Sequence, residues 1–230
     1  MAAKSSVHHE TSSAVEDYAK AIYALEHRGE GAVSTNALAD RLGVTAASAS
    51  GMVKRLDELG LVSHEPYRGV RLTPDGLRLA LEVIRHHRLL ELYLAEQLGV
   101  PWDRVHEEAE VLEHVLSEDL EELISAKLGH PTRDPHGDPI PTPDLRLDEP
   151  DTVALDSLGA GVRGTFVRVS DSDPEMLRYL ADRGIAPGDR FEIVDKQPFD
   201  GPLFARFGSG ADVHVLGGAL AQAMRVEVTS

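Results

Sequence analysis

The chain has 230 residues, of which 42% are hydrophobic, and this length suits one large globular domain or two smaller ones. It contains no cysteine, which excludes disulfides, thiolate catalysis, zinc ribbons and iron–sulfur clusters, and leaves His, Asp and Glu as the strong metal ligands. The net charge is −16, and residues 77–150 hold 17 acidic side chains against 7 basic ones. Such a middle segment attracts divalent cations, while the nearly neutral residues 1–76 can still present a local basic face to DNA.

The ends and the hydropathy of the sequence give an expectation for its location. No run of about 18 apolar residues could span a bilayer, and residues 1–10 lack the apolar core of a secretion signal. We therefore expect a cytoplasmic protein with no membrane partner. Residues 1–12 are small and polar, which predicts a disordered tail.

Residues 13–76 carry the pattern of a winged helix-turn-helix. Apolar residues at helical spacing predict a core-facing helix over Val15–His27, which Ser13 could cap. A short helix, the turn at Gly43 and a second helix capped by Thr45 follow. We expect a small core formed by Ala37, Leu38, Leu42, Val44, Val53 and Leu56. A three-helix interaction domain would show the same packing, but residues 59–76 add a β-hairpin and a capped helix, which favours DNA binding.

The second helix of this motif is expected to enter the major groove through its N-terminal half. Its small residues there allow close approach and offer hydroxyls to phosphates or base edges. Basic residues of the helix and the wing are candidates for phosphate contacts, although each could also be a solvated surface charge. The candidate DNA-binding residues are Thr45, Ala46, Ala47, Ser48, Ser50, Lys54, Arg55, Tyr67, Arg68 and Arg71.

Residues 77–128 are predicted to form two amphipathic helices, one over Leu77–Leu98 and one over Trp102–Leu128. Apolar positions continue along the second helix, which suits burial against a partner helix or an identical subunit, so we expect a homodimer. Residues 129–150 contain six prolines and are predicted to be a linker.

Residues 151–230 alternate between apolar and polar side chains like short strands, and the economical fold is a small β-barrel. The expected strands are Thr165–Val169, Arg190–Val194, Leu203–Phe207, Asp212–Leu216 and Met224–Val228. One helix, Pro174–Arg183, is expected between the first two. The fold class is therefore α+β, with a helix-turn-helix domain, a helical domain and a small barrel in chain order.

Imidazole and carboxylate groups recur at helical spacing in the helical segment. At about 100° per residue, side chains at positions 106, 110, 113 and 114 share one sector of a helix. His87 and Glu91 form a further pair four residues apart. Two neighbouring segments with nitrogen and oxygen donors predict a metal site, against the alternative of a solvated acidic face. Linker residues could also bind metal, although hydrogen bonding within the loop is the stronger expectation for them; they are His130, Asp134, His136 and Asp138.

With these motifs in this order, the sequence resembles the diphtheria toxin repressor family. The most specific parts are residues 85–91 and 105–114, which match the family's metal-binding helices in order and spacing. The likeness is greater to the manganese-responsive branch, the manganese transport regulators. The last domain looks like the SH3-like, ferrous-transport-protein-A-like domain that many members carry.

The resemblance implies two metal sites. The primary site would contain Asp17, Glu110, Glu113 and His114. His87 would lie beside it, either as a bridging ligand of a binuclear site or in an ancillary site with Glu91 and His106. Carboxylates of the barrel would complete the ancillary site; Asp173 is the best match there and Asp171 the nearest alternative. Asp173 could instead be a helix cap.

The ligand types bear on which metal is sensed. Iron-responsive relatives have Met and Cys at the positions of Asp17 and Glu110, and carboxylates in their place suit Mn(II), which prefers harder ligands. Manganese-type members with a binuclear cluster carry a Glu three residues after the position of Asp17. This chain has Lys20 there, which argues against a close binuclear arrangement and for the ancillary site.

These observations predict a repressor that senses cytoplasmic Mn(II), binds a palindromic operator in double-stranded DNA as a homodimer and controls metal-homeostasis genes. The alternative within the family is an Fe(II)-dependent repressor. A metallohydrolase is a remote alternative, because His and carboxylate sites also activate water, but no catalytic constellation accompanies them in the sequence. We therefore expect neither an enzyme nor a small organic substrate. A metal-independent adaptor would bind its partner regardless of chelator.

Overall fold

The computed structural model describes residues 12–28, 31–65, 68–199 and 201–229. Most of the predicted tail, residues 1–11, and Tyr67 lie outside the described residues. The chain forms two compact units. The first comprises residues 1–86, 113–116 and 141–147, and the second comprises residues 87–112, 117–140 and 148–230. In the described ranges, no helix combines the length and the apolar character needed to cross a membrane.

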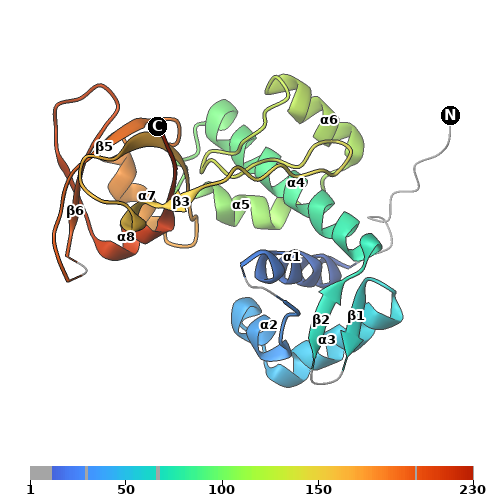
Figure 1. The fold of residues 1–230 in the computed structure, drawn as a ribbon. Helices are drawn as coiled ribbons and strands as arrows, with labels where there is room; N and C mark the ends of the chain where they lie inside the picture. The colour runs from blue at the N-terminus through green and yellow to red at the C-terminus, as the bar shows by residue number, and fades with distance from the viewer. Residues whose placement is uncertain (1–11, 29–30, 66–67, 200, 230) are drawn as a thin grey trace. The chain divides into compact units, whose positions relative to one another are not determined.

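The first unit contains the winged helix-turn-helix (Figure 1). Its elements in chain order are α1 (Ser13–Arg28), α2 (Thr35–Leu42), α3 (Ala46–Glu58), β1 (Val62–Glu65), β2 (Gly69–Leu72) and the first half of α4 (Pro74–Leu98). The two strands form the antiparallel hairpin of the wing, in which Val62 pairs with Leu72. The predicted helix-turn-helix and wing are therefore confirmed.

Local capping explains where these helices begin and end. The Ser34 hydroxyl accepts a hydrogen bond from the Ala37 amide, and Thr45 accepts one from Ser48. Both hydroxyls satisfy amides that lack a partner within the helix. Between the helices, Gly43 has a φ of 65°, a left-handed conformation that glycine adopts without a steric penalty. Ser13 is the first residue of α1 rather than a residue ahead of it.

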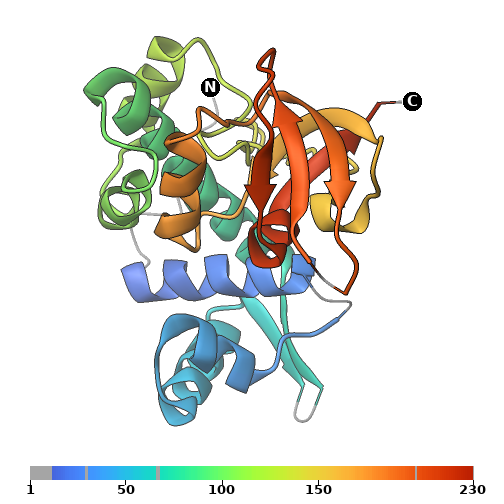
Figure 2. The same ribbon diagram turned by 90° about the vertical axis from the view of Figure 1, so that its left-hand side faces the viewer.

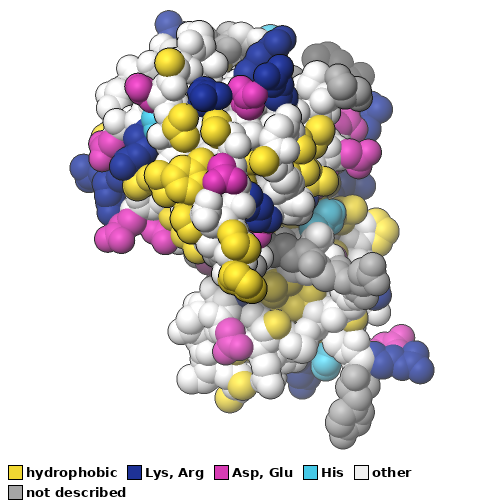
Figure 3. Space-filling view, turned by 60° about the vertical axis from the view of Figure 1, so that its left-hand side comes forward, with side chains coloured by type: hydrophobic (Ala, Val, Ile, Leu, Met, Phe, Trp, Pro, Cys, Tyr) yellow, Lys and Arg dark blue, Asp and Glu magenta, His cyan; other side chains and the backbone are white. Residues whose placement is uncertain are grey.

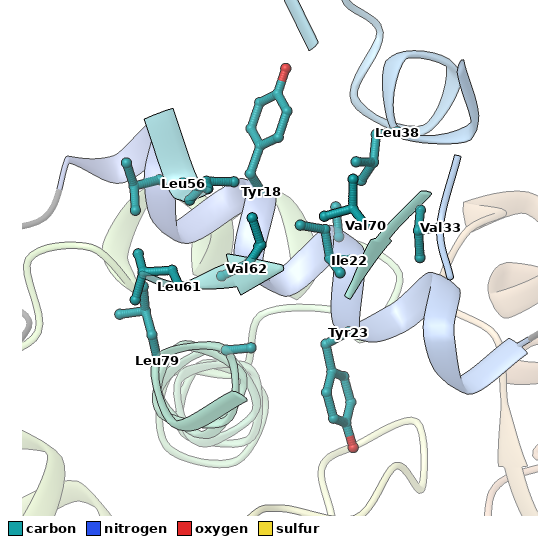
Figure 4. Packing of buried hydrophobic residues seen from close by; sticks show 14 of the residues in the cluster. Tyr18, Ile22, Tyr23, Val33, Leu38, Leu56, Leu61, Val62, Val70 and Leu79 are labelled. Atoms are coloured by element: carbon teal, nitrogen blue, oxygen red, sulfur yellow. The ribbon is translucent and has the colours of Figure 1, made fainter. Parts of the chain in front are cut away.

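The core of this unit draws on all of its elements. Figure 4 shows Ile22 of α1 and Leu38 of α2 near the strand residue Val70, and these three, like Leu56 of α3, are fully buried. The prediction that Val44 belongs to the core is wrong, because this residue is 39% exposed. It follows the glycine turn, where the chain leaves α2 and helical spacing no longer determines which side chains face inward.

The second unit begins with the C-terminal half of α4 and continues with α5 (Val105–Leu112) and α6 (Glu118–Lys127). The predicted single helix Trp102–Leu128 is therefore wrong. The helix ends at Leu112, and the Ser117 hydroxyl caps α6 by accepting a hydrogen bond from the Leu120 amide. Ser117 and the acidic residues of the helical turn that follows it are typical of a helix N-terminus, and they favour the start of a new helix here.

The proline-rich segment is folded rather than loose. In the second unit, Asp134 Oδ1 accepts hydrogen bonds from the amides of His136 and Asp138, both at 2.9 Å. In the first unit, Leu145 and Leu147 pack against the hydrophobic core. The segment lacks regular helices and strands, as predicted, but its side chains are part of both units.

The rest of the second unit is a six-stranded antiparallel sheet in the order β3-β8-β4-β5-β6-β7, seen from two sides in Figures 1 and 2. The elements are β3 (Val153–Ala154), a 3-10 turn (Leu155–Ser157), β4 (Arg163–Val169), α7 (Pro174–Ala181), β5 (Arg190–Lys196), β6 (Leu203–Phe207), β7 (His214–Leu216), α8 (Gly218–Ala223) and β8 (Met224–Val228). Helix α7 ends two residues earlier than predicted, and β3 and α8 are additional to the predicted elements. Phe166, Ile193 and Leu177 are among the buried residues that join the sheet to α7.

Candidate metal centre

The first cluster of possible ligands lies in the first unit and consists of Asp17, Glu113 and His114. One ligand atom from each lies within 4.8 Å of the others. His114 Nε2 is 3.0 Å from Asp17 Oδ1 and 3.7 Å from Glu113 Oε1. Asp17 comes from α1, whereas Glu113 and His114 follow the end of α5. Helical spacing alone therefore does not orient the last two side chains.

A further residue of α1, Glu16, supports this cluster. Glu16 Oε2 lies 2.6 Å from His114 Nδ1, and because an ionised carboxylate only accepts, Nδ1 donates and Nε2 remains on the side of Asp17. A carboxylate behind a histidine ligand fixes its tautomer and orientation in many metal sites. Sequence reasoning did not identify Glu16, although it adjoins Asp17.

Lys20 supplies positive charge within the first cluster. Its Nζ lies 2.6 Å from Oε1 of Glu113, whose side chain is fully buried. A buried carboxylate is costly without a nearby positive charge. The position that weighs against a binuclear cluster in the sequence thus holds an ammonium group in contact with one of the predicted ligands.

The second cluster lies in the second unit and consists of His87, Glu91, His106 and Asp171, with one ligand atom from each inside 4.8 Å. Glu91 Oε1 is 3.0 Å from His87 Nε2 and 3.3 Å from His106 Nδ1. The same nitrogen of His106 is 3.1 Å from His87 Nε2 and 3.1 Å from Asp171 Oδ2. Metal bonds of about 2.0–2.2 Å place neighbouring ligands about 3 Å apart, so these separations suit a single ion.

The protonation of the second cluster follows from its contacts. Hydrogen bonds with Asp171 and then with Glu91 raise the pKa of His106 to about 10. Burial alone would raise the pKa of Glu91, but His87, His106 and His136 together lower it well below the ordinary value. Burial by itself would raise the pKa of Asp171, but its hydrogen bond with His106 and the charges of His106 and His136 together lower it. A proton on His106 thus provides positive charge where a metal ion would bind.

The structure distinguishes the two candidate ligands of the sheet domain. Asp171 lies two residues after β4 and contacts His106. Asp173 caps α7, since its Oδ1 accepts hydrogen bonds from the amides of Glu175 at 2.9 Å and Met176 at 3.4 Å. The structure therefore places the alternative candidate, Asp171, at the cluster, and the preferred match, Asp173, has the capping role.

Glu110 belongs to the second unit, on α5. Its Oε1 lies 3.7 Å from His106 Nε2 and 3.8 Å from His87 Nδ1, so within this unit it borders the second cluster. Its assignment to the primary site with Asp17 stays a prediction.

Of the linker residues, Asp134 and His136 are buried. One ligand atom each of Glu91, Asp134 and His136 lies within 4.8 Å of the others. Burial, Asp138 and Glu91 raise the pKa of Asp134 well above its ordinary value. Asp134 makes the expected hydrogen bonds within the loop, and His136 faces Glu91 at 3.7 Å.

The donor chemistry of both clusters fits a divalent first-row cation. Only imidazole nitrogens and carboxylate oxygens converge, and these ligands suit Mn(II) and related ions. Buried carboxylates from separate segments repel one another unless a cation offsets their charge. In the structure, Lys20 and the proton on His106 provide positive charge at these carboxylates.

The predicted DNA-binding residues are exposed wherever the structure describes them. On α3, the Ser50 hydroxyl donates to the Ala46 carbonyl, and Lys54 pairs at 3.8 Å with Glu58. On the wing, Arg68 pairs with Glu65 at 3.1 Å. Basic, acidic and hydrophobic side chains are interspersed on the face shown in Figure 3. These small and basic residues are accessible, and their contacts with DNA stay a prediction.

Comparison with known proteins gives matches along most of the chain. Residues 10–70 match the N-terminal DNA binding domain of the iron dependent repressors, and residues 73–142 match their metal binding and dimerisation domain. Residues 153–228 match the FeoA domain. The iron-dependent repressor IdeR of Mycobacterium tuberculosis strain H37Rv is 35% identical over 191 residues, which cover 77% of this chain and 82% of IdeR. The diphtheria toxin repressor of Corynebacterium diphtheriae is 32% identical over 229 residues, or 92% of this chain and 96% of that protein.

Solved structures show the same architecture. A manganese-dependent transcriptional repressor in complex with manganese is 43% identical and superimposes with a TM-score of 0.86, covering 94% of this chain and 100% of that one. The manganese regulator SloR is 30% identical, with a TM-score of 0.73 over 94% of this chain and 98% of that one. These findings confirm the resemblance and the fold class. The chain belongs to the family of the iron-dependent and diphtheria toxin repressors, and it is a metal-dependent, DNA-binding transcriptional repressor.

Proposed function

We propose that this repressor senses Mn(II) in the cytoplasm and represses metal-homeostasis genes when the ion is bound. The observation that carries this proposal is the donor set of the two clusters, which consists of nitrogen and oxygen without sulfur. Mn(II) accepts such ligands readily, whereas thioether and thiolate groups favour softer ions. The similarity to a manganese-dependent repressor that was solved with manganese supports the same choice.

In the first cluster, Asp17, Glu113 and His114 would hold the activating ion. A divalent cation supplies positive charge that offsets carboxylate repulsion, and its bonds link segments far apart in the chain. Asp17 is on α1, so ligation would fix this helix to the turn that contains Glu113. Lys20 must leave Glu113 Oε1, or share it, before that oxygen can become a ligand.

Helix α1 packs in the same core as α2 and α3, which explains how ligation can affect DNA binding. Ordering α1 would restrict the positions that the recognition helix α3 adopts. In a homodimer, two such helices at a fixed spacing would match the half-sites of a palindromic operator. Exposed apolar residues on α5 and α6 leave surface for the second copy; they are Val111, Leu120 and Leu123.

In the second cluster, His87, Glu91, His106 and Asp171 would hold a second ion. Asp171 follows a strand of the sheet domain, whereas the other three lie on α4 and α5. Ligation would therefore connect the sheet domain to the helical domain within the second unit.

An Fe(II)-dependent repressor is the second candidate, because the relatives at 35% identity are named iron-dependent. Affinity by itself favours later first-row metals over manganese, so selectivity in the cell depends on ligand geometry and metal availability.

The test is fluorescence anisotropy of a labelled DNA duplex selected from random sequence with the protein and Mn(II). DNA affinity should rise with Mn(II) and fall on chelation, and by linkage DNA should tighten metal binding by the same factor. Zn(II) and Fe(II) are compared at matched free concentrations. Equal activation by Fe(II) and Mn(II) would remove the manganese assignment, and DNA affinity unaffected by chelator would remove metal dependence.

The predicted role of Glu110 is tested in the same assay. Glu110→Ala should abolish activation of DNA binding by metal while the dimer stays folded, as judged by circular dichroism and sedimentation. Unchanged activation would remove Glu110 from the activating site.

A further inference from the structure

The side chain of His136 is buried behind the second cluster and is held in one orientation. It is 1% exposed, and its Nε2 lies 2.8 Å from the carbonyl oxygen of Trp102. A carbonyl only accepts, so Nε2 carries a hydrogen and Nδ1 points to the other side of the ring. There Nδ1 lies 3.7 Å from Glu91 Oε2, and within the described residues it has no hydrogen-bond partner.

The two oxygens of Glu91 thus face different groups. Oε1 contacts His87 Nε2 at 3.0 Å and His106 Nδ1 at 3.3 Å, in the second cluster. Oε2 faces His136. A group that attracts Oε2 also controls the direction in which Oε1 is presented to a metal ion.

The loop that carries His136 is fixed to the sheet domain. The His136 carbonyl accepts a hydrogen bond of 3.0 Å from the amide of Val169, the last residue of β4. Gly137 has a φ of +89°, and a Cβ at this position would lie 2.0 Å from the Val167 carbonyl oxygen. The loop therefore lies against β4 at a distance that only glycine permits. Because Asp171 follows the same strand, β4 anchors both a predicted ligand and the loop behind Glu91.

We propose that His136 is a positioning residue of the second metal cluster, which it serves by holding Glu91 Oε2 so that Oε1 faces His87 and His106. The inference rests on the proposed metal function of that cluster. The contact with Trp102 fixes the ring, so that Nδ1 stays on the side of Glu91 Oε2.

A third ion between Glu91, Asp134 and His136 is the competing explanation for this cluster. Arg88 Nε already lies 3.8 Å from Asp134 Oδ2, and its Nη2 lies 3.8 Å from Asp138 Oδ1. This guanidinium supplies positive charge beside Asp134, so a further cation would meet repulsion as well as ligands. Charge therefore favours the positioning role.

Two substitutions separate the two sides of the ring. His136→Asn places an amide near the position of Nδ1 and keeps a donor toward Glu91. His136→Gln reaches the position of Nε2, keeps the contact with Trp102 and loses the one with Glu91. The measurement is Mn(II) binding to the full-length protein by isothermal titration calorimetry. We expect two ions per wild-type chain, nearly unchanged affinity of the second in His136→Asn, and a loss of about 10- to 100-fold in His136→Gln.

If His136 has only a structural role, both variants should lose affinity for the second ion to the same extent. That result, or no loss of affinity in either variant, would overturn the proposal. Three ions in the wild type and two in the variants would replace it with a third metal site. Glu91→Gln tests the cluster itself, because it should remove the second ion. If the wild type binds one ion only, or if Glu91→Gln keeps two, the proposed second metal site is wrong, whatever the His136 variants show.

A measurement on the wild type covers the case in which a variant fails to fold. In protein labelled with ¹⁵N-histidine and loaded with Zn(II), His87 and His106 should show the nitrogen shifts of metal ligands. His136 should keep a hydrogen on Nε2 and an Nδ1 shift without metal coordination. A coordinated Nδ1 would overturn the positioning role.

Discussion

The two clusters contain similar ligands but balance the charge of their carboxylates in different ways. In the first, the Lys20 ammonium contacts the buried Glu113 at 2.6 Å. In the second, the proton on His106 lies between Glu91 and Asp171. A lysine side chain must move away before an ion can replace it, whereas an imidazole can lose its proton and become a ligand in place. The first cluster should therefore respond to metal by rearrangement and the second by proton release.

The different responses of the two clusters to metal suit different roles in the protein. Rearrangement around Lys20 would involve α1, which packs in the DNA-binding core. Proton release in the second cluster leaves its side chains where they already converge. We therefore expect the first cluster to control DNA affinity and the second to link the sheet domain to α4 and α5.

The largest expected effect concerns the first cluster. Asp17→Ala removes a ligand whose side chain is 37% exposed, so the fold should tolerate the change. Affinity for metal, and with it metal-activated DNA binding, should fall by about 100-fold or more. Anisotropy with labelled operator and Mn(II) measures this loss. Asp182→Ala, an exposed position at the end of α7, is the control and should bind DNA as the wild type does. Similar losses in both variants would contradict the assignment.

The next effect concerns the second cluster and the two neighbouring aspartates. Asp171→Asn should lower the affinity for the second Mn(II) ion by about 30-fold, because it removes a charged ligand. Asp173→Asn should leave metal affinity unchanged, since asparagine caps a helix almost as well as aspartate. Calorimetry measures both constants. If only Asp173→Asn loses the second ion, Asp173 is the ligand, as the sequence match predicts.

The pH dependence should distinguish the clusters. The pKa of His106 is raised to about 10, so a metal ion must displace its proton at neutral pH. Between about pH 7 and pH 9, the apparent affinity of the second ion should rise up to tenfold per pH unit. The stability of the metal-free protein should change in the opposite direction and fall as the pH rises. A raised histidine pKa stabilises the fold fully below about pH 6.5, and this stabilisation is lost as pH rises toward 10.

Calorimetry in buffers of different ionisation enthalpy measures the released protons, and urea unfolding of the metal-free protein measures its stability. His106→Gln should remove the proton release of the second ion. An affinity independent of pH in the wild type would show that the proton on His106 does not compete with metal.

The smallest effect concerns Lys20. Lys20→Met removes the ammonium that contacts Glu113, so the metal-free protein should lose stability and the first ion should bind about fivefold more tightly. Arg41→Met on α2 is a matched control for the loss of a cation. A lower metal affinity in Lys20→Met would show that Lys20 supports the site instead of competing with the ion.

Much of the fold follows from local sequence signals. Gly43 and Thr45 mark the helix-turn-helix, and each has the turn or capping role that the pattern predicts. The end of α5 is different, because apolar and charged positions continue at helical spacing past Leu112. Periodicity favours one long helix there, and the cap at Ser117 shows that a new helix begins.

The sequence by itself determined which donors are available. It contains no sulfur from cysteine, and it spaces His87, Glu91 and His106 so that helices can present them together. It also predicted the DNA-binding motif and the strand-rich domain. Only the tertiary structure decided which donors meet. His114 contacts Glu16, 98 positions away in the sequence, and Asp171 rather than Asp173 reaches His106. Helical and strand periodicity describe side-chain directions over a few residues, whereas a metal cluster depends on where distant segments pack.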